Sequence, residues 1–273
     1  MEKVTIPALH EMKRRGEKIF GVVAWDTHMA AIADRIGADI VSVGDTVGKN
    51  MWGHDTMFEI TMDEMITVTR AARRGTKRAL LSADFPYGPL QEGADAAVRA
   101  AIRFVKEAGV DLIKLDGAAD YPEAVTALVR AGIPVWAQFG LTPQTALSLG
   151  IPYENQAGSD AALPAGMESR MIEEAKMLEA AGAVLLDFTN SGPVVGPKVV
   201  AAVDVPVIGG FGGGPWLDGR VRLAQAAVGY TADALDKEPK GYANVARVIH
   251  DALSACADDV RGARQIKGQP GAN

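Results

Sequence analysis

The chain has 273 residues, of which 48% are hydrophobic and 23% charged, as is typical of a globular protein with a full core. Its formal net charge of −6 argues against a nucleic acid or an anionic membrane surface as a partner. The single cysteine, Cys256, excludes an intrachain disulfide and suits a reducing cytoplasm, and the sequence shows neither a signal peptide nor an apolar run of roughly 20 residues.

Short apolar runs alternate with helical stretches after an extra N-terminal helix, which is predicted at residues 5–18 and could close one end of a barrel. The runs are continuously apolar, as in strands covered on both faces, and such strands are typical of parallel sheets. The predicted strands are 20–25, 40–44, 79–83, 112–115, 135–139, 184–186 and 205–208.

The helical stretches complete a series of strand–helix–strand units. Three of them end in glycine directly before a strand, in "EAGVD", "RAGIP" and "EAAGA". No eighth strand is evident, since residues 230–239 hold no apolar run. The predicted helices are 28–36, 61–74, 92–108, 122–131, 168–181, 193–203, 219–228 and 242–259.

Seven strands and this length favour a (β/α)8 TIM barrel of the α/β class over an open doubly wound sheet. We find no linker, so residues 1–273 are expected to form a single barrel domain with an extra N-terminal helix. In both folds the ligand sits at the carboxyl ends of the strands. The polar residues at those ends are therefore the candidates for a site.

Three successive predicted strands lead into carboxylates, Asp45, Asp84 and Asp116. Neighbouring strands lie only about 4.8 Å apart, so these charges would repel one another and raise their pKa values. A hard divalent cation would remove that penalty, and oxygen ligands without His or Cys indicate Mg²⁺ or a similar ion. Each Asp considered by itself could instead be a turn residue or a helix cap.

Three further polar residues occupy the same end of the predicted barrel. Lys114 lies in an apolar strand, where Lys is rare unless paired, and Asp116 or a neighbouring strand could supply the partner. Gln138 could be a satisfied core amide, and Asp187 could cap the following helix through Ser191. Together with the carboxylates, these residues favour a site over unrelated structural roles.

The chain also resembles the ketopantoate hydroxymethyltransferase family from about residue 3 to residue 229. The resemblance rests on several short segments in family-like order and spacing: "KVTIPAL", "VGDTVG", "GHDT", "ADFPYG", "EAGVDLIKLDG", "GLTPQ", "LEAAGA" and "VPVIGGFGGGPWLDG". It implies a (β/α)8 barrel of the phosphoenolpyruvate mutase and isocitrate lyase type, assembled as a homo-oligomer, usually a decamer. Hydroxymethyl transfer to a 2-oxo acid, in pantothenate biosynthesis, is the activity that it implies.

Carried over by position, the resemblance makes Asp45 and Asp84 the two metal-binding aspartates. Thr46 matches a Ser that helps to hold the substrate carboxylate, and Lys114 matches a Lys near the substrate. Asp45, Thr46, Asp84 and Lys114 are thus the expected substrate-binding residues. The implied cofactors are Mg²⁺ or another divalent cation, with 5,10-methylenetetrahydrofolate as co-substrate.

Four features depart from the family pattern. Asp116, expected as the third metal ligand, stands where the family has a Glu of the metal shell. Gln138 stands for a His, and Asp187 stands for the Glu proposed as general base. The segment "GIPYENQAGSDAALPAG", residues 150–166, replaces a "GGYKVQGR"-like stretch and lacks its Arg. The expected catalytic residues are therefore Asp187, Lys114 and Gln138, two of them altered.

These departures have chemical consequences. A 2-oxo acid can chelate a metal, which stabilises the enolate as a Lewis acid while a carboxylate removes the C3 proton. Replacing Glu by Asp retracts the carboxylate by roughly 1.5 Å, enough to disturb an oriented proton transfer. Gln keeps the hydrogen bonding of His but loses a group that gains a proton near neutral pH. We therefore expect enolate chemistry with an altered substrate or partner carbonyl.

Three hypotheses from different classes follow. The leading one is an aldol-type transferase that adds a one-carbon unit from the folate to 2-oxoisovalerate or a close analogue. The alternative is a folate-independent aldolase or lyase on a different 2-oxo acid. A non-catalytic scaffold is disfavoured by Asp45, Asp84 and Lys114. The glycine-rich segment "GGFGGGPWLDG" lacks the Lys-Ser/Thr of a nucleotide P-loop, so close backbone packing is its preferred interpretation over contact with a substrate carboxylate.

Overall fold

The computed structural model describes residues 2–145, 167–238 and 240–269. The chain divides into two compact units, Met1–Arg222 and Leu223–Asn273, and each is described by itself. The altered segment at residues 150–166 lies outside the described residues. The single domain expected over residues 1–273 stays a prediction.

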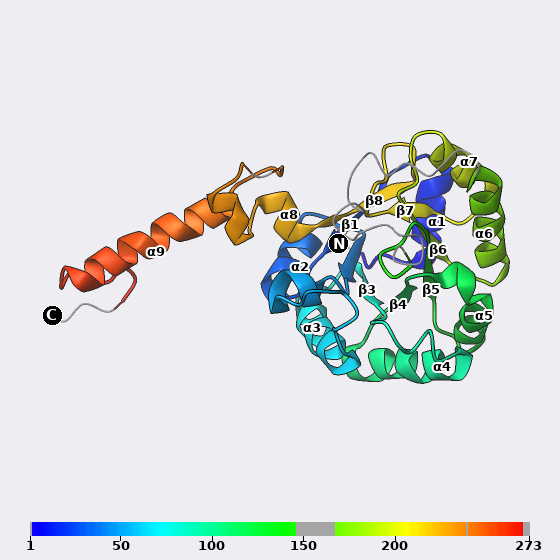
Figure 1. Ribbon diagram of the computed structural model, residues 1–273, viewed down its shortest axis with the longest axis horizontal. Coiled ribbons are helices and arrows are strands. Elements are labelled where there is room, and N and C mark those ends of the chain that lie inside the picture. The colour runs from blue at the N-terminus through cyan, green and yellow to red at the C-terminus, as the bar shows by residue number, and fades with distance from the viewer. Residues whose placement is uncertain (1, 146–166, 239, 270–273) are drawn as a thin grey trace. The chain divides into compact units, whose positions relative to one another are not determined.

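Eight strands form a closed barrel in which every described neighbouring pair is parallel and follows chain order (Figure 1). The amide of Ile19 donates to the carbonyl of Asp218 at 3.0 Å, beside the seam between the last strand and the first. The (β/α)8 TIM barrel predicted from the sequence is therefore confirmed. The strands are β1 Ile19–Val23, β2 Ile40–Val43, β3 Leu80–Asp84, β4 Leu112–Leu115, β5 Val135–Gly140, β6 Leu185–Thr189, β7 Val207–Gly209 and β8 Gly219–Leu223.

Helices α2 to α7 surround the ring of strands (Figure 1). Local sequence explains where several of them begin: Asp26 accepts from the amides of His28 and Met29 at the start of α2, and Thr61 with Glu64 forms a capping box on α3. The helices of the barrel are α2 Thr27–Arg35, η1 Gly48–Trp52, α3 Met62–Gly75, α4 Ala94–Arg103, η2 Phe104–Ala108, η3 Ala118–Asp120, α5 Pro122–Arg130, α6 Glu168–Ala180 and α7 Val195–Ala202.

The extra N-terminal helix is α1, Ile6–Arg14, and it packs against the amino ends of the strands. Leu9 is fully buried in a cluster with the first residues of several strands, among them Ile40 and Leu112. The Lys13 ammonium donates to the carbonyls of residues 200, 203 and 205 at 2.9 to 3.1 Å and pairs with Asp218 at 3.1 Å. The expected closure of one barrel end is thus confirmed.

The eighth strand lies where the sequence predicted a helix, and this prediction was wrong. Residues 219–228 form β8 and then the short helix α8, Ala224–Val228. A Cβ on Gly219 would lie 2.3 Å from the Ile19 carbonyl oxygen, so the strand needs glycine to approach β1. Buried and more exposed positions alternate along β8: Val221 joins the core, while Arg220 and Arg222 on either side of it are more exposed. The segment is short and contains a glycine and two arginines, so its sequence does not show the continuous apolar run of a buried strand.

The second unit contains α8, η7 Ala232–Leu235 and α9 Val245–Arg261. The amides of Tyr242 and Ala246 bond back to the carbonyls of Ala227 and Gly229 at 2.7 and 2.9 Å, which tie this unit together. None of the helices in the described part of the chain is both long and apolar enough to span a membrane.

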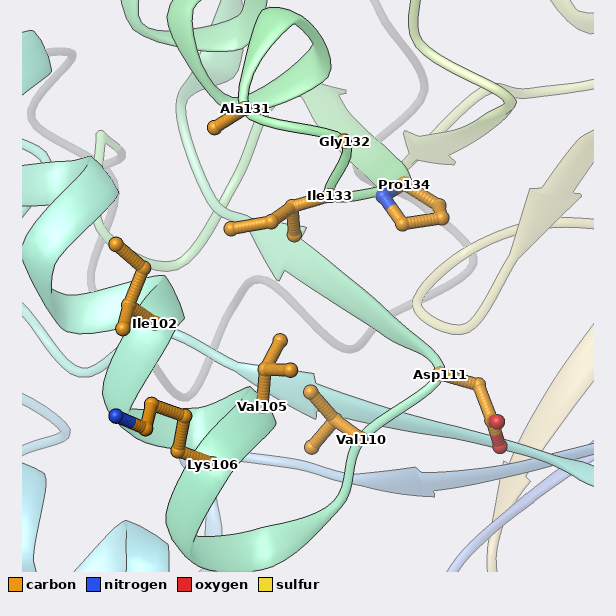
Figure 2. A pocket seen from close by; sticks show the side chains of 9 residues that line it. All are labelled: Ile102, Val105, Lys106, Val110, Asp111, Ala131, Gly132, Ile133 and Pro134. Atoms are coloured by element: carbon orange, nitrogen blue, oxygen red, sulfur yellow. The ribbon is translucent and has the colours of Figure 1, made fainter.

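A surface pocket of about 470 Å³ opens between η2 and the turn that leads into β5 (Figure 2). Its lining is largely apolar, with Ile102 and Val105 on one side and Ile133 on the other. Asp111 and Pro134, which also line it, directly precede β4 and β5, so the pocket lies at the amino ends of the strands. It is therefore at the opposite end of the barrel from the predicted site.

Candidate functional site

The predicted site residues all lie at or just beyond the carboxyl ends of the strands. Each is at most 9% exposed. Strand register places them beside one another, because Asp84 is the partner of Lys114 across β3 and β4, and Gln138 is the partner of Asp187 across β5 and β6. The residues are Asp45, Thr46, Asp84, Lys114, Asp116, Gln138 and Asp187.

Lys114 is the centre of a buried polar network. Its Nζ lies 3.1 Å from Asp84 Oδ2 and 3.3 Å from Asp187 Oδ2, and it donates to Gln138 Oε1 at 2.5 Å. It also lies 5.6 Å from the centre of the Trp136 ring. Burial by itself lowers the pKa of Lys114, but the surrounding carboxylates outweigh burial and raise it. The ammonium is therefore charged, and it links β4 to side chains on β3, β5 and β6.

Asp45 and Asp116 share a second support, Gln144 in the loop after β5. Gln144 Nε2 donates to Asp45 Oδ2 at 3.2 Å, and its backbone amide donates to Asp116 Oδ2 at 3.4 Å. Burial raises the pKa of Asp45, and the charges of Asp84 and Asp116 raise it further. Burial raises the pKa of Asp116 to about 7, against a hydrogen bond from Thr142 that favours the charged form.

Asp84 and Asp187 are the carboxylates of the site that lie closest to the Lys114 ammonium. Burial raises the pKa of both, while the Lys114 ammonium acts in the opposite direction. One oxygen of each carboxyl, Oδ1, is buried without a hydrogen-bond partner, and the same is true of Asp116 Oδ1. Buried carboxylate oxygens without partners are costly, which makes them candidates for a cation or a substrate proton.

The oxygen chemistry of this cluster suits a hard divalent ion. Four carboxylates surround one ammonium, so an added cation would relieve their repulsion. In the described part of the chain, however, no three His, Cys, Asp or Glu side chains are arranged so that they could hold a metal together. The ligand set Asp45, Asp84 and Asp116 stays a prediction. Mg²⁺ is commonly held by one or two carboxylates, with water and substrate completing its shell.

The structure decides between some of the alternatives for single residues. Asp187 does not cap a helix, since α7 begins at Val195 without a side-chain cap and Asp187 lies within β6. Ser191 instead accepts from Trp216 Nε1 at 2.9 Å. Lys114 pairs with Asp84 on the neighbouring strand β3 and with Asp187 on β6, two strands away. The buried amide of Gln138 has hydrogen-bond partners on both its oxygen and its nitrogen, Lys114 and Thr189, and both partners belong to the site.

Thr189 and Gln144 are among the supporting residues of this cluster that sequence reasoning missed. Thr189 accepts from Gln138 Nε2 at 3.0 Å, so the Gln138 amide is oriented by Thr189 on one side and by Lys114 on the other. Gln144 lies in the segment "GLTPQ", which the family resemblance includes without giving this residue a role. Their polar side chains beside strand ends were the available signal.

The glycine-rich segment after β7 packs closely, as predicted. A Cβ on Gly209 would lie 2.6 Å from Leu217 Cδ1, and one on Gly212 would lie 2.2 Å from Asn190 Oδ1. Gly212 also has a φ of +60°, which favours glycine, and Asn190 itself has a φ of 56°. The segment is therefore glycine-rich for steric reasons.

Comparison with known proteins identifies the family. The family model of ketopantoate hydroxymethyltransferase matches residues 3–265. The chain belongs to the ketopantoate hydroxymethyltransferase family. Proteins named 3-methyl-2-oxobutanoate hydroxymethyltransferase are similar over nearly their whole length: that of Cyanothece sp. is 37% identical over 94% of this chain and 96% of its own, and that of Cytophaga hutchinsonii is 34% identical over 96% and 93%. This member of the family is accordingly an enzyme of the hydroxymethyltransferase type.

Solved structures show the same fold at low sequence identity. A 2,3-dimethylmalate lyase of the PEP mutase/isocitrate lyase superfamily matches with a TM-score of 0.61 at 14% identity, over 97% of this chain and 91% of its own. A phosphonopyruvate hydrolase in complex with oxalate and Mg²⁺ matches with a TM-score of 0.55 at 15% identity, over 98% and 92%. The chain thus has the same barrel fold as these two enzymes.

Proposed function

We propose that this protein catalyses a metal-dependent, aldol-type hydroxymethyl transfer from 5,10-methylenetetrahydrofolate to a 2-oxo acid, either 2-oxoisovalerate or a close analogue. Family membership supports the reaction type. The buried network in which Lys114 holds Asp84 and Asp187 at the carboxyl end of the barrel supports the roles that we propose for individual residues.

Asp45 and Asp84 would hold the divalent cation, with Asp116 completing or supporting its shell. A divalent ion bound there supplies Lewis-acid stabilisation for negative charge on the oxo oxygen of the substrate. A solved structure with the same fold contains oxalate and Mg²⁺, which supports a divalent ion, though not these particular ligands. Thr46, which is 9% exposed beside Asp45, would donate its hydroxyl to the substrate carboxylate.

Asp187 would act as the general base. Its Oδ1 has no hydrogen-bond partner, while Oδ2 is held by Lys114, so the carboxyl has a fixed orientation and one free oxygen. Burial raises its pKa, which strengthens it as a base near neutral pH. Asp187 would accept the C3 proton of the 2-oxo acid, and C3 would then form a bond to formaldehyde released from the folate by water. The returning proton neutralises the new alkoxide, so the protons balance.

Gln138 would orient rather than transfer a proton. Its amide bonds to Lys114 and Thr189, and an amide does not ionise in this pH range. It fixes Lys114 against Asp187. This rigid arrangement and the short side chain of Asp187 also favour a second candidate function, a folate-independent aldolase or lyase that acts on a different 2-oxo acid.

Hydrogen exchange tests the proposal. The protein is incubated in D2O with Mg²⁺ and a panel of 2-oxo acids, without a one-carbon donor, and loss of the C3 hydrogens is followed by NMR. We expect exchange of 2-oxoisovalerate or a close analogue and loss of exchange in Asp187→Asn. Absence of exchange for every acid would contradict the enolisation step itself.

A second arm separates the two reactions. Once the exchanging acid is known, 5,10-methylenetetrahydrofolate is added and the hydroxymethylated product is measured. Product formation that depends on the folate supports the transferase. Exchange without any product, combined with cleavage of a hydroxylated or dicarboxylic 2-oxo acid, would establish the aldolase or lyase instead.

A further inference from the structure

Arg220, on the strand that sequence reasoning missed, holds the loop that follows β7. Its Nε donates to the carbonyl of Gly209 at 2.9 Å, and Nη2 donates to the carbonyl of Gly210 at 3.3 Å. Nη1 donates to the carbonyl of Gly213. One partly buried guanidinium thus binds three backbone carbonyls within five residues of a glycine-rich segment.

No carboxylate forms an ion pair with Arg220 among the described residues, so backbone carbonyls are its partners there. A guanidinium keeps its charge when it is partly buried, and its fork of five N–H groups can bind several acceptors at once. Burial lowers the pKa of Arg220 and the charge of Arg222 lowers it further, while the charge of Asp187 acts in the opposite direction. A loop rich in glycine has little conformational preference of its own, so these three bonds fix its path.

The fixed loop leads to the proposed base. Gly210 accepts from Arg220 through its carbonyl, and its backbone amide lies near enough to the Asp187 carboxyl to favour the charged form. Asp187 Oδ1 is buried without a hydrogen-bond partner, so the Gly210 amide does not satisfy that oxygen. Strand pairing gives the same proximity, since Asp187 faces Ile208 across β6 and β7, two residues before Gly210.

We propose that Arg220 is a positioning residue for Asp187: by holding the carbonyls of Gly209, Gly210 and Gly213, it keeps the Gly210 amide beside the Asp187 carboxyl. The inference rests on the proposed function, because it assumes that Asp187 removes the substrate proton. In this proposal Arg220 acts without contact to the substrate. It acts through the peptide group of Gly210, and Lys114 restrains the same carboxyl from the other side.

The test compares Arg220→Met with Arg222→Met, which removes an exposed arginine two residues along the same strand. We expect Arg220→Met to lower kcat for C3–H exchange about 10-fold or more, with KM for the 2-oxo acid and the affinity for Mg²⁺ unchanged within about twofold. Arg222→Met should match the wild type. Guanidinium chloride at millimolar concentration should partly restore exchange in Arg220→Gly, because the free cation can bind the same carbonyls.

A double variant locates the effect. If Arg220 acts through Asp187, Arg220→Met should cause no further loss of exchange in an Asp187→Asn background. Multiplying losses would overturn the proposal, as would a lower melting temperature with unchanged kcat, or a raised KM alone, since these indicate a purely structural role and a substrate contact respectively.

A crystal structure of Arg220→Met provides a readout independent of activity. We expect residues 209–213 to move and the distance from the Gly210 amide to the Asp187 carboxyl to change. An unmoved loop would overturn the proposal even if the enzyme is active. Conversely, a wild type that exchanges no 2-oxo acid would contradict the proposed function, while a displaced loop would still show that Arg220 positions Asp187.

Discussion

At the scale of single residues, the unusual feature is one lysine among four buried carboxylates. Lys114 pairs with Asp84 and Asp187, while Asp45 and Asp116 receive only neutral donors such as Gln144. Charge is thus compensated on one side of the cluster and not on the other. The uncompensated side is where a cation would bind, and the compensated side is where a base with a fixed orientation remains.

Metal binding should depend on Asp84. Asp84→Asn should abolish metal-dependent ligand binding while the fold is kept, because the amide is nearly isosteric but carries no charge for the cation. Isothermal titration calorimetry with Mg²⁺ measures the affinity. Asp204→Asn, an exposed change just before β7 at the other end of the barrel, is the matched control. Unchanged affinity in Asp84→Asn would show that the metal site lies elsewhere.

Asp187 should be required for proton abstraction. Asp187→Asn should slow C3–H exchange by roughly 10²–10⁴-fold with Mg²⁺ affinity preserved. Asp187→Glu should not by itself give fast turnover of 2-oxoisovalerate, because Lys114, Gln138 and Thr189 hold the pocket for the shorter acid. Fast ketopantoate formation by Asp187→Glu would instead show that the pocket is that of the familiar transferase.

Asp116 should make stability depend on pH. Its pKa in the folded state is about 7 and its ordinary value is 3.8, so the folded protein binds the proton more tightly than the unfolded chain. This group therefore lowers the free energy of unfolding as pH rises from about 4 to 7. In metal-free protein, Asp116→Asn should be more stable than wild type by about 1–4 kcal/mol at pH 8 and equal to it near pH 4. Urea denaturation at both pH values measures the difference, and a constant difference would exclude titration as its cause.

At the scale of elements, β8 and α1 complete the barrel. β8 closes the ring next to β1, where Gly219 lies against the Ile19 backbone, and α1 covers the amino ends of the strands. Both elements leave the carboxyl ends to the site residues. β8 also carries Arg220, so closure of the barrel and support of the β7 loop depend on the same short strand.

The seam between β8 and β1 should not tolerate a side chain. Gly219→Ala places a Cβ 2.3 Å from the Ile19 carbonyl oxygen, so strands must separate, and we expect a loss of about 2–4 kcal/mol of stability. Gly210→Ala is the control, because its Cβ would meet only the Val221 carbonyl oxygen, at 3.8 Å. Thermal and chemical denaturation compare the two, and equal stability would show that the seam can widen freely.

At the scale of the whole molecule, α9 presents an apolar stripe. Ile249, Leu253, Cys256 and Val260 follow one another at helical spacing, and Leu253 and Val260 are 65% and 56% exposed. Exposed apolar surface of this kind is typical of an interface between protein chains. It suits the homo-oligomer implied by the family resemblance, which stays a prediction.

Sedimentation should therefore show an assembly. We expect a homo-oligomer at micromolar concentration for the wild type, and a shift toward smaller species for Leu253→Glu, because burying a charge in an apolar interface is costly. Asp251→Glu, an exposed change on the same helix, should leave the assembly unchanged. A wild type of 28.7 kDa at that concentration would contradict the prediction.

The sequence alone determined the barrel and named most residues of the candidate site. Continuous apolar runs identify parallel strands because every side chain of a strand covered on both faces is buried. All strands of the barrel run in the same direction, so the polar residues that follow these runs lie at the same end of the barrel. Asp45, Asp84, Lys114, Gln138 and Asp187 could be named for this reason. Their motifs also identified the family.

Only the tertiary structure decided how these residues are paired. The partners of Lys114 lie 30 and 73 positions away in the chain, and they are chosen by strand register. β8 was missed because its conformation depends on the space beside Ile19, a property of its neighbours. Arg220 could not be assigned a role until that strand and the β7 loop were placed together. Local patterns determine what is buried, whereas contacts between distant segments determine which charge meets which.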